Sequence, residues 1–275
     1  MTNTDTQKIK VPISPQAETP EVNFTGFTPG MIYGDTHQGL VRMGNEDSYA
    51  YSVSEKGDSI LALVADGIGG NECGDLASRF VAEKMLRDFQ IRSGGGFETQ
   101  QMALDYLRSS IILANSALRG LNSNFNIVHP MGCTLASALF LQNVVITGHA
   151  GDSRVYCLRD HKLIQYTQDH SLVAEMLQRG EITPEAAKRH PFAHVISKSI
   201  GIEQEMDPEF NVFRRAPHDR FLICSDGVML HLSDSVIRDI LDSAKDAREA
   251  VSKIISMTLR GGGGDNTTAV CIFTG

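Results

Sequence analysis

The stretch Leu61-Ala62-Leu63-Val64-Ala65-Asp66-Gly67 is an apolar run that ends directly in an aspartate followed by a glycine. A short apolar run of this kind predicts a buried β-strand. The stretch Phe221-Leu222-Ile223-Cys224-Ser225-Asp226-Gly227 repeats the arrangement. A carboxylate at the end of a buried strand stays ionised at low cost only if it is paired or binds a cation. Both stretches therefore indicate a possible cation site.

Two further aspartates stand beside glycines near other apolar runs. Gly151-Asp152-Ser153-Arg154 follows the run at 144–146 after a few residues, and Gly264-Asp265-Asn266 directly precedes the last apolar run. If the four carboxylates converge, their oxygens form a site that suits Mg²⁺ or Mn²⁺. A single Asp-Gly after a strand is more often only a turn. Spacing alone therefore leaves both interpretations open.

Glycines follow the first of these aspartates closely. Gly67, Gly69 and Gly70 would let the backbone approach an ion and offer a carbonyl oxygen as a ligand.

The segment Arg42-Met43-Gly44-Asn45-Glu46-Asp47 places an arginine close to two adjacent acids. Most clusters of this kind are ion pairs on the surface. Beside a metal site, the guanidinium would instead bind phosphate oxygens, and the acids would orient an ion or its water. Arg42 is thus either a phosphate-binding residue or a structural partner of Glu46 or Asp47.

The predicted secondary structure has a mixed order. Apolar runs predict strands at 60–65, 144–147, 155–158, 221–224 and 267–273. Helical spacing predicts two helices with apolar faces, one at Leu76, Phe80, Val81, Met85 and Phe89 and another at Leu107, Ile111, Ala114, Leu118 and Leu121. Capping signals predict a third helix that opens at Thr183-Pro184-Glu185. A fourth is predicted to be capped by Ser233, with Val236, Ile237 and Ile240 facing the core. This order favours an α+β fold over a strictly alternating parallel sheet.

Composition excludes several classes of protein. The chain has 275 residues and a formal net charge of -8, which argues against nucleic-acid binding. No apolar run approaches the roughly 18 residues of a membrane helix, so no membrane insertion is expected. Residues 1–30 are predicted to be a flexible leader, and 31–275 one domain. Five scattered cysteines without a C-x-x-C spacing predict reduced thiols in the cytoplasm: Cys73, Cys133, Cys157, Cys224 and Cys271.

Taken in order, these motifs resemble the PPM family of protein phosphatases, also called the PP2C type, and in particular its bacterial branch. The resemblance covers about residues 33–273. The segments that carry it are Gly39-Leu40-Val41-Arg42, Asn45-Glu46-Asp47, Val64 to Gly70, Met131-Gly132-Cys133-Thr134, Gly151 to Arg154, Thr167 to Val173, Ser225-Asp226-Gly227 and Gly264 to Thr268.

The resemblance implies a fold and an activity. The fold is an αββα sandwich, two packed antiparallel β-sheets flanked by helices. The activity is hydrolysis of phosphoserine and phosphothreonine in proteins, by attack of a metal-bound hydroxide on phosphorus with two or three Mn²⁺ or Mg²⁺ ions. The implied partners are phosphorylated protein substrates and a cognate serine/threonine kinase that the enzyme opposes.

The resemblance also assigns roles to single residues. It implies that Asp66 bridges two ions and that the Gly67 carbonyl binds the second, while Asp226 and Asp265 bind the first. Glu46 and Asp47 would lie beside the pair, and Arg42 would bind the phosphate. Asp152 would join Asp226 at a third ion, and Asp169, His170 and Ser171 would belong to a mobile flap beside the site, formed by Thr167 to His190.

Two positions depart from the family pattern. Ile68 stands where many eukaryotic members carry a histidine thought to protonate the leaving group, so the identity of the general acid stays open. Cys133 replaces the more usual threonine, for which only a packing effect is expected.

Three other functions compete with a protein phosphatase. A binding module with a decayed site is disfavoured because every implied ligand position carries an acid. Another two-metal hydrolase, such as a nuclease, is disfavoured by the acidic charge balance. Hydrolysis of a small phosphoester would use the same site and is not separated by the sequence.

Overall fold

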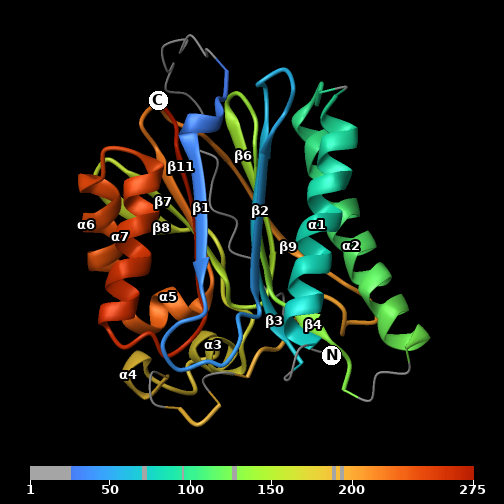
Figure 1. The fold of residues 1–275 in the computed structure, drawn as a ribbon, viewed down its shortest axis with the longest axis vertical. Helices are drawn as coiled ribbons and strands as arrows, with labels where there is room; N and C mark the ends of the chain where they lie inside the picture. Colours follow the sequence, from blue (N-terminus) through green and yellow to red (C-terminus); the bar gives the residue numbers. More distant parts are fainter. Residues whose placement is uncertain (1–25, 70–72, 95, 126–128, 188–189, 193–194) are drawn as a thin grey trace, which may run out of the picture.

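Two antiparallel sheets lie face to face, with helices on both outer sides (Figure 1). The computed structural model describes residues 26–69, 73–94, 96–125, 129–187, 190–192 and 195–275. One sheet has the order β1-β11-β10-β7-β8, and the other has the order β2-β3-β5-β6-β9, with β4 paired to β3. The predicted α+β class and the αββα sandwich are confirmed.

The strands and helices have the following bounds. The first sheet consists of β1 (Ile32–His37), β11 (Thr267–Phe273), β10 (Arg220–Cys224), β7 (Arg154–Arg159) and β8 (Lys162–Gln165). The second consists of β2 (Asp47–Val53), β3 (Ile60–Ile68), β4 (Gly132–Cys133), β5 (Leu135–Phe140), β6 (Val144–Ala150) and β9 (Glu209–Arg214). The helices are η1 (Pro29–Met31), α1 (Cys73–Ser93), α2 (Gln100–Asn124), α3 (Leu172–Gln178), α4 (Pro184–Ala187), α5 (Asp226–His231), α6 (Asp234–Ser243) and α7 (Ala247–Arg260).

Strand β3 is apolar from Ile60 to Ala65 because both of its faces are covered there. Its side chains alternate between the two faces of the sheet. Ile60, Ala62 and Val64 belong to the core between the sheets, whereas Leu61 and Leu63 pack in the core under α1 and α2. A third core lies between the first sheet and helices α5 to α7.

The predicted helices agree with the structure in part. Leu76 is 44% exposed and does not join the buried face of α1. The helix predicted to open at Thr183-Pro184-Glu185 is present as α4, and the Thr183 hydroxyl accepts a hydrogen bond from the Ala186 N–H at 3.2 Å. Ser233 occupies the N-cap position of α6, but its side chain makes no capping hydrogen bond there.

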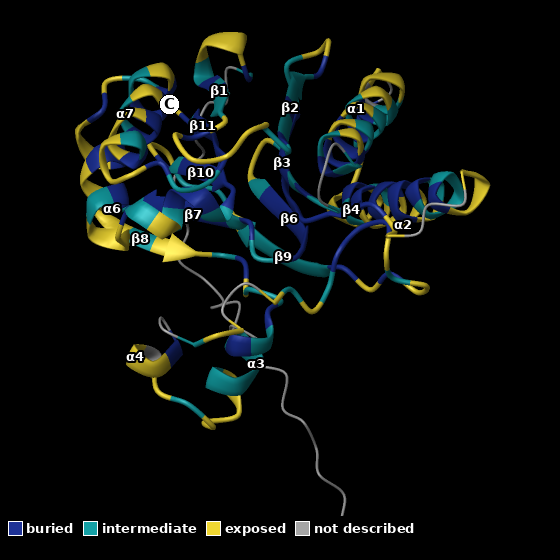
Figure 2. Cartoon of the chain, turned by 60° about the horizontal axis from the view of Figure 1, so that its bottom comes forward, coloured by how far each residue is buried: buried dark blue, intermediate teal, exposed yellow. Residues whose placement is uncertain are grey.

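The N-terminal leader falls mostly outside the described residues, which begin at residue 26. Phe27 is buried, and its N–H donates to the Gly57 carbonyl. Phe27, within the predicted leader, therefore packs in the core of the sandwich. At the opposite end of the sandwich, α3 and α4 project away from both sheets (Figure 2).

Candidate metal centre

Asp47 and Asp66 begin the site. Asp47 opens β2 and pairs in register with Asp66 near the end of β3. Residues directly opposite each other on antiparallel strands point to the same face of the sheet. Thr134 fixes the backbone at Asp66: its N–H donates to the Asp66 carbonyl at 2.8 Å, and its Oγ1 accepts from the Asp66 N–H at 3.0 Å.

Asp47 is buried and held by two hydroxyl groups. Its Oδ2 accepts hydrogen bonds from Ser225 Oγ and Thr268 Oγ1, both at 2.7 Å. Its Oδ1 is buried and has no hydrogen-bond partner among the described residues. Burial raises the pKa of Asp47 to about 7, against the opposing effect of the two hydroxyls. The free oxygen is therefore available to a cation or to a water that a cation holds.

Asp152 and Asp226 come from the ends of other strands. Asp226 is the first residue of α5, one residue after β10 of the first sheet, and Asp152 lies in the turn between β6 of the second sheet and β7 of the first. Burial first, and then the charge of Asp226, raises the pKa of Asp152 to about 7. Asp152 Oδ1 is also buried without a hydrogen-bond partner in the described part of the chain.

Asp66 lies in the middle of these acids. It keeps some surface in contact with solvent, although protein surrounds it on most sides. Burial raises the pKa of Asp66 well above its ordinary value. The charges that raise it further are those of Asp47, Asp226, Asp152 and Asp265. We call these five residues the carboxylate cluster.

Arg42 and Asp265 form an ion pair at the rim of the cluster. Arg42 Nη2 lies 2.7 Å from Asp265 Oδ2, and the two side chains are 52% and 23% exposed. This hydrogen bond is the main cause that raises the pKa of Arg42. The expected alternative partners, Glu46 and Asp47, form no ion pair with Arg42 among the described residues. Arg42 thus pairs with an acid that the resemblance assigns to a metal.

Glu46 sits where three backbone segments meet without side chains between them. The Gly67 N–H donates to the Glu46 carbonyl at 3.1 Å. A Cβ atom added to Gly67 would lie 2.2 Å from the Gly74 carbonyl oxygen, and one added to Gly74 would lie 2.8 Å from Glu46 Cδ. The Gly67 position therefore requires glycine, whereas a side chain at Gly74 would displace the Glu46 carboxylate. Of the other predicted glycines, Gly69 is described and Gly70 lies outside the described residues.

Asn266 was not singled out from the sequence, yet it holds this loop in place. Its Oδ1 accepts from the Glu46 N–H, and its Nδ2 donates to the carbonyls of Gln38 and Gly44, all at 2.8 Å. Like Ser225, Thr268 and Thr134, Asn266 lies within a motif that the sequence shows. In that motif only the adjacent Asp265 carries a charge that indicates a metal ligand.

The segment predicted to begin the flap is tied to the sandwich. Asp169 accepts two hydrogen bonds from Arg154, Nε to Oδ1 at 2.8 Å and Nη2 to Oδ2 at 2.6 Å. The ring of His170 lies near Gly151, whose N–H donates to its Nδ1 at 3.2 Å. Ser171 caps α3 by accepting from the Ala174 N–H.

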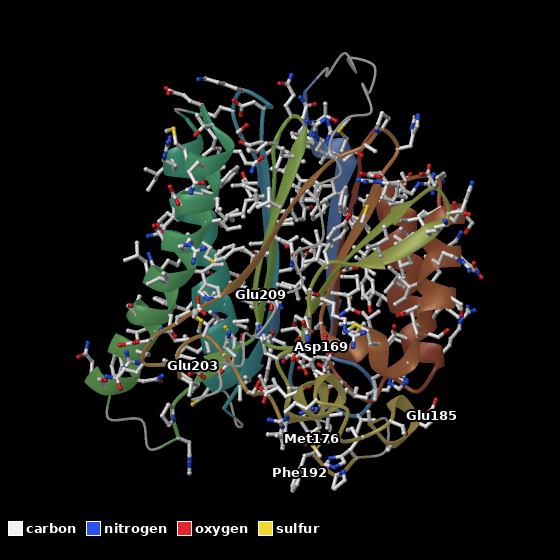
Figure 3. All side chains as sticks on the ribbon, turned by 180° about the vertical axis from the view of Figure 1, so that it is seen from behind. Asp169, Met176, Glu185, Phe192, Glu203 and Glu209 are labelled. Carbon is white, nitrogen blue, oxygen red and sulfur yellow. The ribbon has the colours of Figure 1, made fainter. Side chains whose placement is uncertain are left out.

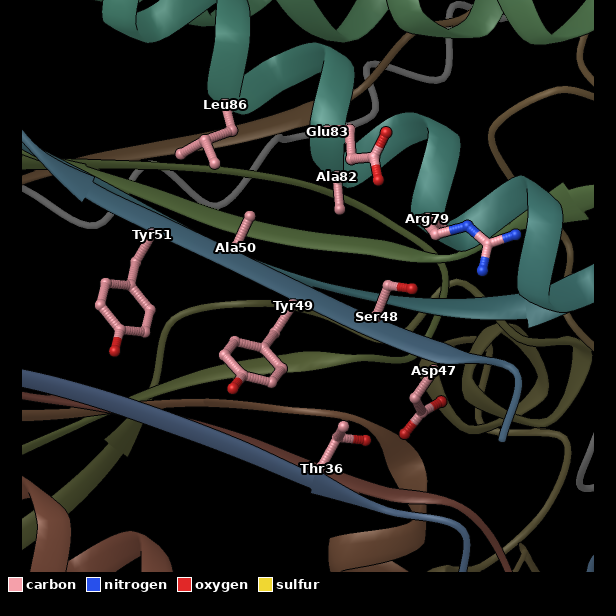
Figure 4. Close-up of a pocket in the computed structure, with 10 residues that line it drawn as sticks. All are labelled: Thr36, Asp47, Ser48, Tyr49, Ala50, Tyr51, Arg79, Ala82, Glu83 and Leu86. Atoms are coloured by element: carbon pink, nitrogen blue, oxygen red, sulfur yellow. The ribbon is translucent and has the colours of Figure 1, made fainter. Parts of the chain in front are cut away.

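A cavity of about 470 Å³ lies beside the cluster, between β1, β2 and α1 (Figure 4). Of the five clustered acids, only Asp47 lines it, together with Tyr49, Tyr51, Arg79 and other residues of β2 and α1. The cavity approaches the cluster from the open edge of the sandwich and does not contain it.

The donor set fits hard divalent cations. It consists of carboxylate oxygens from five aspartates, two of which present a buried Oδ1 without a partner in the described residues. Like charges this close oppose one another unless protons or cations neutralise them. Oxygen-only ligands are those that Mg²⁺ and Mn²⁺ prefer.

Comparison with known proteins identifies the family of the chain. The family described as protein phosphatase 2C matches residues 35–259. The serine/threonine phosphatase stp of Listeria monocytogenes is 31% identical over 242 residues, which cover 86% of this chain and 93% of that protein.

Solved structures resemble the whole sandwich. The phosphatase PstP of Mycobacterium tuberculosis has a TM-score of 0.79 at 32% identity, covering 89% of this chain and 98% of that chain. The catalytic domain of PstP in complex with two manganese ions has a TM-score of 0.77 at 32% identity, with the same two shares covered.

This chain belongs to the protein phosphatase 2C family. The predicted family, serine/threonine phosphatase activity and Mn²⁺ or Mg²⁺ cofactor are confirmed at the level of that family. Within the described residues, no helix combines the length and the apolar composition needed to cross a membrane.

Proposed function

We propose that the carboxylate cluster, with Glu46, Gly67 and Arg42, is the centre at which this protein hydrolyses phosphoserine and phosphothreonine. The observation that carries the proposal is the position of Asp66 among four other carboxylates, which raise its pKa in addition to burial. Such a concentration of acids destabilises the folded protein unless bound cations neutralise the repulsion between the carboxylates, and such perturbed groups are typical of functional sites.

Each residue then has a role. Asp66, the Gly67 carbonyl, Asp226 and Asp265 would hold the two divalent ions of the centre. Glu46 and Asp47 would orient the water around them, and Asp152 would contribute with Asp226 to holding a third ion. Divalent ions held there supply a water of lowered pKa and positive charge for the phosphoryl oxygens.

Arg42 contributes the phosphate contact. Its guanidinium is half exposed and pairs with Asp265. When Asp265 turns to a cation, the fork of Arg42 becomes free to bind two phosphoryl oxygens and to neutralise charge in the transition state. Asp47 keeps its orientation throughout because Ser225 and Thr268 hold Oδ2 and leave Oδ1 toward the site.

The substrates are phosphorylated proteins, and a serine/threonine kinase of opposite action is the proposed partner. The proposed phosphatase domain is 31–275, with 1–30 as a leader. All five cysteines are free thiols, which supports a cytoplasmic location.

The experiment compares three substrates with the Mn²⁺-loaded protein: a phosphothreonine peptide, the matching phosphotyrosine peptide, and p-nitrophenyl phosphate. We expect the phosphothreonine peptide to have the highest kcat/KM, with all turnover abolished in Asp226→Asn. A preference for the small ester or for phosphotyrosine would contradict the proposed substrate class. Turnover by Asp226→Asn at the wild-type rate would contradict the proposed centre.

A further inference from the structure

A second group of possible metal ligands lies outside the carboxylate cluster. His149 on β6 stands opposite Glu209 on β9 in the strand register. The ring of His170 stacks on that of His149, with centroids 4.6 Å apart and an interplanar angle of 2°. One candidate ligand atom from each of the three residues lies within 4.8 Å of the other two. Figure 3 labels Glu209 and, near the root of α3, Asp169, the residue before His170.

The hydrogen bonds of His149 prepare one ring nitrogen for a ligand. His149 Nε2 lies 2.8 Å from the Gln168 carbonyl oxygen, which accepts but cannot donate, so Nε2 carries the proton. Nδ1 then has a free lone pair. It is buried and has no hydrogen-bond partner among the described residues. Metal-binding histidines use this arrangement, in which a carbonyl fixes the tautomer from the far side of the ring. Burial also lowers the pKa of His149, which favours the neutral ring.

His170 and Glu209 are joined only by a long contact. His170 Nε2 lies 3.4 Å from Glu209 Oε2, while His170 Nδ1 accepts from the Gly151 N–H at 3.2 Å. An ion that binds Nε2 requires the neutral His170 ring to carry its proton on Nδ1 instead, at the cost of the long Gly151 hydrogen bond. The Glu209 side chain is 40% exposed, so it is free to turn and leaves the group open to solvent.

The spacing is close to that of a zinc site. Zn–N and Zn–O distances near 2.0–2.2 Å place tetrahedral ligand atoms roughly 3.4 Å apart. The three atoms here, within 4.8 Å of one another, must therefore approach by at most about 1.4 Å. The Glu209 side chain is partly exposed and can rotate. Because a Zn–N bond lies in the plane of its imidazole ring, the His170 ring must also turn out of its parallel stack on His149 to face the same ion.

We propose that His149, His170 and Glu209 form a binding site for Zn²⁺ that is separate from the carboxylate cluster. Two imidazoles and a carboxylate are a common ligand set for Zn²⁺, whereas Mg²⁺ prefers oxygen alone. A bound ion would join His149 on β6 and Glu209 on β9 to His170, which directly precedes Ser171, the N-cap of α3. It would thus fasten the start of the flap to the second sheet. The site does not depend on the proposed assignment of the catalytic centre.

The test measures Zn²⁺ binding by calorimetry in excess Mg²⁺, which saturates oxygen ligands and competes weakly for nitrogen. The variants are Glu209→Gln and His149→Gln. Glu205→Gln removes an exposed acid shortly before β9 and serves as the matched control. We expect the wild-type protein and Glu205→Gln to bind one Zn²⁺ that Glu209→Gln and His149→Gln bind at least tenfold more weakly, the minimum loss seen even for outer partners of ligands.

Thermal unfolding checks that each variant is folded. If His149→Gln, at a buried position, does not fold, Glu209→Gln alone still decides the test. A second probe is the visible absorption of Co²⁺, which we expect to be intense in the wild-type protein and weak in Glu209→Gln. Equal Zn²⁺ affinity and stoichiometry in the wild-type protein and Glu209→Gln would overturn the proposal. So would the absence of any Zn²⁺ binding by the wild-type protein. Neither result bears on phosphatase activity, which is not the readout.

Discussion

Asp47 and Asp66 share one rung of the ladder between β2 and β3, so two carboxylates project side by side from the same face of the sheet. Like charges directly opposite each other destabilise an antiparallel pair. The structure compensates at Asp47 with two hydroxyl donors, Ser225 and Thr268. The rest of the compensation must come from protons or cations, and this requirement gives the site a measurable dependence on pH and metal.

The first prediction concerns pH in the absence of metal. Burial raises the pKa of Asp47 and of Asp152 to about 7, from an ordinary value of 3.8. The folded state therefore binds more protons than the unfolded state between about pH 4 and pH 7, and the free energy of unfolding falls as pH rises through that window.

In chelator, we expect the melting temperature to be lower at pH 8 than at pH 5. A loss of only 1 kcal/mol lowers it by roughly 2–4 °C in a protein of this size. Saturating Mn²⁺ should raise the melting temperature at pH 8 and reduce the difference. A metal-free protein that becomes more stable from pH 5 to pH 8 would show that the pKa values of these carboxylates are not raised in the folded state.

The second prediction concerns the hydroxyl groups on Asp47. Thr268→Val preserves the shape and the β-branched side chain of β11 but removes the donor to Asp47 Oδ2. A hydrogen bond to a charged group contributes about 1.5–3 kcal/mol, so Thr268→Val should cost about that much at pH 8 and less at pH 5, where Asp47 is protonated.

Thr258→Val is the matched control for this variant. Thr258 is also buried, but its Oγ1 has no hydrogen-bond partner among the described residues. Its replacement should leave the free energy of unfolding unchanged or raise it. Urea unfolding of both variants at the two pH values provides the comparison. Equal losses in the free energy of unfolding for Thr268→Val and Thr258→Val would show that the hydrogen bond to Asp47 does not contribute to stability.

The third prediction separates phosphate binding from metal binding at Arg42. Arg42→Ala should weaken binding of substrate and of product phosphate by about 1.5–3 kcal/mol, because a charge-assisted bidentate contact is lost. Arg42→Lys should restore only part of the loss, since an ammonium group cannot fork onto two oxygens.

Mn²⁺ affinity should hold or rise in Arg42→Ala, because the ion pair with Asp265 no longer competes with the cation. Michaelis constants and Mn²⁺ titration by calorimetry measure the two effects separately. Unchanged substrate binding together with impaired metal binding would assign Arg42 to the support of Asp265 instead of to the phosphate.

Much of the site was predictable because its acids follow apolar strands. Asp66 and Asp226 stand at or next to strand ends, and the order of the motifs identified the family. The sequence could not show that Arg42 pairs with Asp265, because 223 positions separate the two residues and their loops meet through the β1–β11 pairing and the hydrogen bonds of Asn266.

The supporting groups were hidden for the same reason. Ser225 and Thr268 reach Asp47 across 178 and 221 positions, through contacts that arise only when the two sheets face each other. Hydroxyl residues are common in strands, so nothing in local sequence separates these two from the others. The helix start at Thr183 was predictable because its signals are local: a capping threonine followed directly by proline.

The most direct test of the centre is the number of Mn²⁺ ions bound by Asp66→Asn, measured by equilibrium dialysis together with turnover of p-nitrophenyl phosphate. Asn keeps the size of the side chain and relieves repulsion, so the variant should fold and melt no lower than the wild-type protein in chelator. Asp207→Asn, at an exposed position outside the cluster, is the control. We predict that Asp66→Asn loses turnover and binds at least one Mn²⁺ ion at least tenfold more weakly, while Asp207→Asn matches the wild-type protein. A folded Asp66→Asn protein with wild-type Mn²⁺ stoichiometry and a near-normal rate would contradict the assignment of the centre to these carboxylates.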